Sequence, residues 1–185
     1  GALGEAGGIS TNSFDLNQKI CSLRNYGRDM TDGAYNQYLG SNKRCDEIQA
    51  AFLSRKLDFL DDIKSKRLDL TNIYRKNLNS QLIEYQSTSS PHLAVLRLKS
   101  KKYRDALAQY LKDSGIGSAI HYKVPCNSQP FINPQQIKIS DSVSLQAQDI
   151  ANTILSLPLS EVHTPEEIKF VCNTVNSFLK CQSDL

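Results

Sequence analysis

The feature that most constrains the fold is a run of helical periodicity from Asp46 to about Asn79. Apolar residues recur along it at steps of three, four and seven, at Ile48, Phe52, Phe59, Ile63, Leu70, Ile73, Tyr74 and Leu78. This spacing predicts one long amphipathic helix or two helices in series. At about 1.5 Å of rise per residue the run would extend over tens of ångströms, so we expect it to bridge two bodies.

Polar residues lead into this run from Gly40. Glycine can adopt backbone angles that other residues resist. Asn42 and Arg44 offer directional hydrogen-bond donors, and the planar fork of an arginine suits an anion. Asp46 and Glu47 place negative charge where a helix N-terminus favours it. The segment is therefore a candidate ligand loop, although an ordinary loop with a helix cap has the same residue types.

The residues before Gly40 predict a Gly-rich opening, a short strand and a helix. Ile9 to Thr11 are β-compatible and precede a helix expected over residues 17–24. Gly27 follows as a C-terminal stop for that helix. Residues 28–39 are polar, and we expect them to form a surface loop.

The rest of the chain alternates predicted strands and helices. In chain order we expect a strand over 92–98, a helix over 101–114, a strand over 116–124, a polar connection over 126–142, a helix over 143–155 and an extended piece over 157–159. A capping box at Thr164, Pro165 and Glu167 begins the last helix. Its apolar face is Ile168, Val171, Cys172, Val175, Phe178 and Leu179. This order predicts an α+β domain in which helices cover a sheet.

Composition argues against several functions. The 185 residues hold 22 basic and 19 acidic side chains, a formal charge of +3, without the basic run that nucleic-acid binding favours. No apolar run approaches the roughly 18 residues of a membrane-spanning helix, so we expect no membrane partner. The five cysteines match no zinc spacing and form no CxxC. We therefore expect free thiols in a reducing cytoplasm and no metal site.

Three histidines are the remaining candidates for chemistry. His163 precedes the helix cap and is expected to be a surface residue. For His92, at a strand entrance, a structural role is favoured over a functional one. His121 and Tyr122 stand at a predicted strand end before a polar loop, where side chains reach ligands. The residues alone do not decide between a ligand-binding and a structural role for His121.

Five motifs together resemble the nucleotide-sugar aminotransferases of the DegT/StrS type, which are fold-type I enzymes that use pyridoxal 5′-phosphate (PLP). Each motif is weak alone, but the five follow the family's order over nearly the whole chain. They are GALGEAGGI at 1–9, LRNYG at 23–27, GSNKRCDEIQAA at 40–51, GIGSAIHY followed by VP within 115–125, and LSLPL at 155–159 with TPEEI at 164–168.

The resemblance implies an α/β fold in three parts. Residues 1–45 would be the end of the PLP-binding large domain, and residues 46–80 would be a linking helix. Residues 81–185 would be a small C-terminal α+β domain with an antiparallel or mixed sheet covered by helices. Members of the family are homodimers with active sites at the subunit interface, so a homodimer is implied as well.

The resemblance also implies a reaction. An amino group would pass from glutamate, by way of PLP, to the keto sugar of a nucleoside-diphosphate sugar, in amino-sugar or surface-polysaccharide synthesis. Asn42 would bind the cofactor phosphate of the neighbouring subunit, and Arg44 would steady that loop or meet an anionic group. Tyr26 would approach the nucleotide, while His121 and Tyr122 would face the sugar nucleotide or its diphosphate.

Some positions depart from the family pattern. The family's cofactor lysine stands three residues before the position matched by Gly1, so the chain contains no catalytic lysine at this motif and we expect it to be inactive alone. Residues that are usual in the family are also replaced, at Ser41, Lys43, Lys123 and Asn127, which leaves the identity of the sugar open.

Two alternative functions also stay open: a PLP-dependent sugar dehydratase of the same fold, and a non-catalytic fragment that only dimerises or binds a partner.

Overall fold

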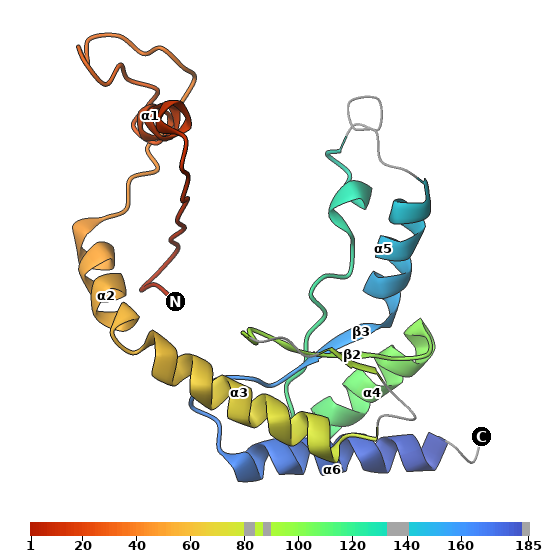
Figure 1. Ribbon diagram of the computed structural model, residues 1–185. Coiled ribbons are helices and arrows are strands. Elements are labelled where there is room, and N and C mark those ends of the chain that lie inside the picture. The colour runs from red at the N-terminus through yellow and green to blue at the C-terminus, as the bar shows by residue number, and fades with distance from the viewer. Residues whose placement is uncertain (80–83, 87–89, 133–140, 183–185) are drawn as a thin grey trace. The chain divides into compact units, whose positions relative to one another are not determined.

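The computed structural model describes residues 1–79, 84–86, 90–132 and 141–182, drawn in colour in Figure 1. The chain divides into two compact units, each held together by its own internal contacts. The N-terminal unit is Gly1–Leu60 and the C-terminal unit is Asp61–Leu185. Helices and strands of the C-terminal unit form the α+β architecture that the sequence predicts, with helices and an antiparallel sheet.

Two helices and a long loop make up the N-terminal unit. Helix α1 spans Phe14–Leu23 and helix α2 spans Glu47–Leu57. Ser13 caps α1, because its side-chain oxygen accepts a hydrogen bond from the Leu16 N–H at 3.2 Å. The helix predicted over residues 17–24 is therefore confirmed, and this cap explains why it begins three residues earlier than expected.

The strand predicted at Ile9 to Thr11 is wrong. These residues adopt no strand, and the Ile9 side chain is 73% exposed. A strand needs a hydrogen-bonded neighbour, and within residues 1–60 no segment pairs with residues 9–11. Side chains that favour β-structure do not form it without a partner, so the segment leads into α1 as irregular chain.

The long helical run is two helices in series, one of the two predicted forms. Helix α3 spans Leu60–Asn77 and follows α2 after a break at Asp58 and Phe59. The Arg55 guanidinium contacts both residues of the break, pairing with the Asp58 carboxylate at 2.6 Å and lying 4.7 Å from the centre of the Phe59 ring. Neither residue is glycine or proline, so the periodicity alone could not locate the break.

An antiparallel sheet in the order β1-β2-β3 organises the described part of the C-terminal unit. The strands are Glu84–Gln86, Ala94–Arg97 and Ile154–Leu157. Ala94 lies opposite Leu157 and Leu96 lies opposite Leu155, so these four side chains share one face of the sheet. All four are buried, which makes this face the side of the sheet that packs on the core.

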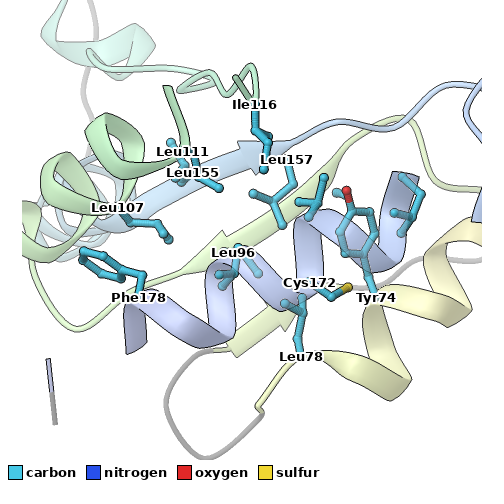
Figure 2. Close-up of a cluster of buried hydrophobic side chains, with 14 of the residues drawn as sticks. Tyr74, Leu78, Leu96, Leu107, Leu111, Ile116, Leu155, Leu157, Cys172 and Phe178 are labelled. Carbon is cyan, nitrogen blue, oxygen red and sulfur yellow. The ribbon is translucent and has the colours of Figure 1, made fainter. Parts of the chain in front are cut away.

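Helices pack against that face and close the core, as Figure 2 shows. Besides α3, the unit contains α4 (Lys101–Asp113), a short 3₁₀ turn η1 (Cys126–Ser128), α5 (Asp141–Thr153) and α6 (Pro165–Gln182). The largest fully buried apolar side chains are Tyr74, Leu96, Leu107, Leu111, Leu155, Ile168, Val175 and Cys172. The apolar face predicted for the last helix is confirmed, because all six of its residues are buried.

No helix within the described residues combines the length and apolar character needed to cross a bilayer.

The strand predicted over residues 116–124 is wrong. Among the residues that the structure describes, its one ladder contact is a bridge between Ala119 and Ser156 of β3, made by two backbone hydrogen bonds of 3.1 and 2.7 Å. The chain turns at His121 and Tyr122 directly afterwards, so the pairing cannot extend. Ile116, at the start of the segment, packs into the core instead.

The helix predicted over residues 143–155 is confirmed as α5, but it ends at Thr153 because the next four residues form β3. All four are buried, and their pairing with β2 outweighs the helical periodicity. The extended piece expected over 157–159 therefore begins three residues earlier. Within the predicted connection 126–142, η1 is an ordered turn, and residues 133–140 lie outside the described residues.

The capping box at the start of α6 is confirmed. The Thr164 N–H donates to Glu167 Oε2 at 2.7 Å, and the Glu167 N–H donates to Thr164 Oγ1 at 3.2 Å. The hydrogen bond from the Thr164 backbone lowers the pKa of the Glu167 carboxyl. A charged carboxylate is thereby maintained at the positive end of the helix.

Arg104 is a buried cation that no sequence pattern predicts. Its side chain donates from one terminal nitrogen to the Ala151 carbonyl at 3.2 Å and to the Ile154 carbonyl at 3.4 Å, where α5 ends. Its Nε pairs with the Asp105 carboxylate at 2.6 Å. The guanidinium thus satisfies the Ala151 carbonyl, which the C-terminus of α5 leaves without an intrahelical partner, and the carbonyl of the first residue of β3.

Burial of Cys172 should make stability fall at alkaline pH. The side chain is fully buried, and burial raises the pKa of the thiol from 9.0 to about 11. Between these values the unfolded chain loses the proton and the folded chain keeps it, so the free energy of unfolding falls as pH rises. We expect a loss of roughly 1–3 kcal/mol between about pH 8 and about pH 11, measured by urea denaturation.

The matched variant is Cys172→Ala, which should lack this part of the pH dependence while keeping the contributions of all other groups. Identical pH profiles for the wild type and the variant would contradict the assignment.

Candidate functional site

The loop between α1 and α2 holds three of the predicted site residues, and backbone hydrogen bonds join its beginning to its end. We call residues 24–46 the α1–α2 loop. An antiparallel bridge joins Asn25 to Asn42. The backbone hydrogen bonds around it run from the Ser41 N–H to the Leu23 carbonyl (3.1 Å), from the Lys43 N–H to the Arg24 carbonyl (2.8 Å) and from the Tyr26 N–H to the Ser41 carbonyl (3.2 Å). The two ends of the loop therefore lie side by side.

Two glycines permit this packing. A Cβ added at Gly40 would lie 2.3 Å from the Gly27 nitrogen and 2.5 Å from the Leu23 carbonyl oxygen, too close for any side chain. Gly27 has a φ of +77°, and its N–H donates to the Ser22 carbonyl at 2.8 Å, which confirms the predicted stop for α1. For Gly40 the sequence predicted freedom of backbone angle, whereas the structure shows that space is the constraint.

A carboxylate fixes the tip of the same loop. Asp29 Oδ1 accepts hydrogen bonds from the backbone N–H groups of Thr31 at 2.7 Å and Asp32 at 2.9 Å, and its other oxygen accepts from the Gln37 side chain. A further hydrogen bond from the Thr31 hydroxyl is the main cause of a lowered pKa for Asp29. The charged carboxylate thus accepts the hydrogen bonds of backbone N–H groups in the turn.

Asn42 and Arg44 lie together at the end of the α1–α2 loop. Asn42 Oδ1 accepts a hydrogen bond from Arg44 Nε at 3.2 Å and a weaker one from the Arg44 backbone N–H at 3.4 Å. The amide oxygen thus accepts its hydrogen bonds from Arg44, and the two hydrogens of the amide nitrogen do not take part in this contact. Both residues are exposed. The pair therefore presents N–H donors and a positive charge to solvent, the chemistry that binds an anion.

Tyr26 lies on the same loop in a conformation that is unusual for a tyrosine. Its φ is +63°, in the left-handed region that costs a residue with a Cβ about 1–2 kcal/mol. The Arg28 guanidinium lies 5.7 Å from the centre of its ring, and the ring remains partly exposed. Strain of this kind persists where surrounding structure imposes it, and it is concentrated at functional sites.

The other two predicted site residues lie in the C-terminal unit. His121 and Tyr122 are adjacent in sequence, and their rings meet edge to face with centres 5.4 Å apart. His121 Nδ1 lies 3.0 Å from the Ser156 hydroxyl on β3. Tyr122 is 73% exposed. Ser156 was not among the predicted site residues, and the only sequence signal for it is a hydroxyl between two leucines of a buried strand.

The remaining histidines have structural surroundings. His92 Nδ1 lies 3.4 Å from a terminal nitrogen of Arg67, whose guanidinium also pairs with Glu161 at 2.8 Å. His163 was expected at the surface, but it is only partly exposed and its Nδ1 is buried. The residue also lines a hollow. The hollow has a volume of about 460 Å³ and lies where α6 begins, beside Phe170.

The residues that the structure describes contain no group of three or more histidine, cysteine, aspartate or glutamate side chains placed to hold an ion. The five cysteines are all free thiols, as their spacing predicts.

Comparison with known proteins identifies the family. Residues 2–176 match the DegT/DnrJ/EryC1/StrS aminotransferase family. The chain belongs to this family, and the resemblance drawn from the five motifs is confirmed.

Two curated relatives illustrate the family's substrates. The chain is 34% identical to dTDP-3-amino-3,6-dideoxy-alpha-D-galactopyranose transaminase of Aneurinibacillus thermoaerophilus over 177 residues, which are 93% of this chain and 46% of that protein. It is 26% identical to UDP-2-acetamido-2-deoxy-3-oxo-D-glucuronate aminotransferase of Pseudomonas aeruginosa, again over 93% of this chain and 46% of the relative. The chain therefore spans about half the length of the curated relatives it matches.

Solved structures show the same fold. The chain is similar to Streptomyces venezuelae DesV in complex with a ketimine intermediate, with a TM-score of 0.75 and 27% identity over 91% of this chain and 45% of that one. Bacillus subtilis NtdA with bound pyridoxamine phosphate, the amino form of the cofactor, gives a TM-score of 0.77 at 21% identity, over 92% and 41% of the two chains. The predicted fold class is confirmed, and so is the prediction of a PLP-using family.

We predict that Gly40→Ala disrupts the α1–α2 loop, because the added Cβ would collide with backbone rather than with a flexible side chain. The expected cost is roughly 1–3 kcal/mol, with faster amide hydrogen exchange over residues 23–43. Gly8→Ala is the matched control, since a Cβ there has no atom within 4 Å. Equal exchange rates in the two variants would show that the glycines do not fix the loop.

Proposed function

We propose that residues 1–185 form part of a PLP-dependent aminotransferase that transfers an amino group from glutamate to the keto sugar of a nucleoside-diphosphate sugar. The observation that carries the proposal is the Asn42–Arg44 donor pair on a loop whose backbone is fixed. The names of the relatives above support it, since both are transaminases of nucleotide sugars. They favour transamination over the dehydratase alternative and over a purely structural role.

The donor pair fits the phosphate of the cofactor. A phosphate needs N–H donors and positive charge, and it cannot use a neighbouring oxygen acceptor. Arg44 occupies the acceptor of Asn42 and leaves the amide nitrogen to donate. Among the described residues, none accepts a hydrogen bond from that nitrogen, so both of its hydrogens are available for the phosphate. The Arg44 terminal nitrogens add charge beside it.

The chain's own residues would bind and orient. Bound PLP supplies an electron sink for breaking and forming the carbon–nitrogen bond. Asn42 and Arg44 would hold the phosphate of the cofactor in a second subunit, which makes a homodimer part of the proposal. Tyr26 would approach the nucleotide, and His121 and Tyr122 would contact the sugar or the diphosphate. Hydrogen-bond donors of the protein limit the translational and rotational freedom of the bound substrate before the chemical step.

The position of the chain in the whole protein is part of the same proposal. Residues 1–45 would complete the PLP-binding large domain, residues 46–80 would link the domains, and residues 81–185 would be the small domain. The free thiols are consistent with a cytoplasmic enzyme of amino-sugar or surface-polysaccharide synthesis.

The activity is tested on the natural-length protein that contains these residues. It is incubated with PLP, glutamate and nucleoside-diphosphate keto sugars carrying dTDP, UDP or GDP, and the products are identified by mass spectrometry. The proposal predicts a glutamate-dependent amino sugar from at least one of them. Loss of water from the sugar without amination would support the dehydratase, and no turnover of any substrate would contradict the proposal.

We predict that Asn42→Ala weakens PLP binding by roughly 10- to 100-fold, because hydrogen bonds to a charged group are worth about 1.5–3 kcal/mol. The measurement is an absorbance titration of the natural-length apoprotein with PLP. Asn173→Ala, at an exposed position on α6, is the control and should leave the affinity unchanged. Equal affinities for the two variants would remove Asn42 from the phosphate site.

A further inference from the structure

Ser156 is a buried polar residue on the face of β3 that points away from the core. Its neighbours in the strand, Leu155 and Leu157, pack into the core, and Ser156 pairs with Val95 on the opposite face of the sheet. Only 4% of its surface is exposed. A hydroxyl in this position needs a hydrogen-bond partner, since a buried donor that remains unpaired costs free energy.

The partner of that hydroxyl is the ring of His121, at 3.0 Å from Oγ to Nδ1. The backbone of Ser156 also fixes the chain just before His121. The Ala119 N–H donates to the Ser156 carbonyl at 3.1 Å, and the Ser156 N–H donates to the Ala119 carbonyl at 2.7 Å. One strand residue therefore holds both the backbone and the side chain of the segment that carries His121.

The direction of the side-chain hydrogen bond follows from burial. His121 Nδ1 is the hydrogen-bond partner of the Ser156 hydroxyl in the described part of the chain, so the hydroxyl proton is satisfied when Nδ1 accepts it. An imidazole that accepts at Nδ1 carries its proton on Nε2 in the neutral form. The edge-to-face contact with the Tyr122 ring further limits rotation of the imidazole.

We propose that Ser156 is a positioning residue that holds His121 as the Nε2–H tautomer, with this N–H as a hydrogen-bond donor to an oxygen of the bound sugar nucleotide. The substrate part of this inference rests on the proposed function. A donor at Nε2 suits a sugar hydroxyl, a carbonyl or a diphosphate oxygen, all of which accept hydrogen bonds. Ser156 would act only through His121 and would not touch the substrate.

The tautomer is measured directly by nitrogen-15 NMR of the natural-length protein labelled at histidine, at a pH where imidazole is neutral. The His121 signals are assigned by comparison with a His121→Gln variant. The wild type should show a protonated Nε2 and an unprotonated Nδ1. In Ser156→Ala the shifts should move toward the mixture of free imidazole, and Ser156→Thr, which keeps the hydroxyl, should retain the wild-type pattern.

Binding of the non-reacting probes dTDP-glucose, UDP-glucose and GDP-glucose to the PLP-loaded protein is measured by calorimetry. Ser156→Ala should weaken the best probe roughly three- to tenfold, with PLP affinity unchanged. Ser156→Thr should restore probe binding. The control Ser114→Ala, which removes a hydroxyl bonded to the Tyr110 carbonyl at the end of α4, should have no effect.

The outcomes separate the two proposals. A wild-type His121 protonated on Nδ1, or the same tautomer in the wild type and Ser156→Ala, would overturn the role of Ser156. Probe binding that is equal in the wild type and Ser156→Ala would overturn its effect on the substrate. A wild type that binds none of the three probes would contradict the proposed function, and with it a substrate role for His121, while the NMR result would still decide the contact.

Discussion

The structure of the candidate cofactor site depends on a close approach of two backbone segments at Gly27 and Gly40. No Cβ fits at Gly40, because the Gly27 nitrogen would lie 2.3 Å from it. This contact brings the two ends of the α1–α2 loop together and allows the bridge between Asn25 and Asn42. Asn42 therefore stands on fixed backbone, although its side chain is exposed. A donor in a fixed place can bind an anion without first losing conformational freedom.

In the C-terminal unit a strand, β3, holds the candidate binding residue in a fixed place. β3 lies between β2 and Ala119: it pairs with β2 on one side, and Ser156 exchanges both of its backbone hydrogen bonds with Ala119 on the other. Its leucines anchor the core, and its serine faces the segment that carries His121. In both units a polar side chain is thus oriented by a neighbour: Arg44 orients the Asn42 amide, and Ser156 orients the His121 ring. Orientation by a second residue is what gives such donors their direction.

Local signals in the sequence predicted the features that depend on local chemistry. The capping box at Thr164, the stop at Gly27 and the apolar face of α6 are all present, because each is set by residues within a turn or two. Features that depend on distant partners were not predicted correctly. Strands were predicted at Ile9 to Thr11 and over residues 116–124, but within the described residues the first segment has no strand beside it and the second has one bridge, at Ala119. No local pattern marks Ser156, because its partner His121 lies 35 residues away in sequence.

The proposed cofactor site requires that Asn42 donates a hydrogen bond to the phosphate of PLP. The most direct test is a crystal structure of the natural-length protein with PLP bound. We expect the Asn42 amide nitrogen within about 2.7–3.2 Å of a phosphate oxygen, with its amide oxygen still turned to Arg44. A phosphate bound elsewhere, with Asn42 beyond hydrogen-bonding distance of it, would show that Asn42 does not bind the cofactor.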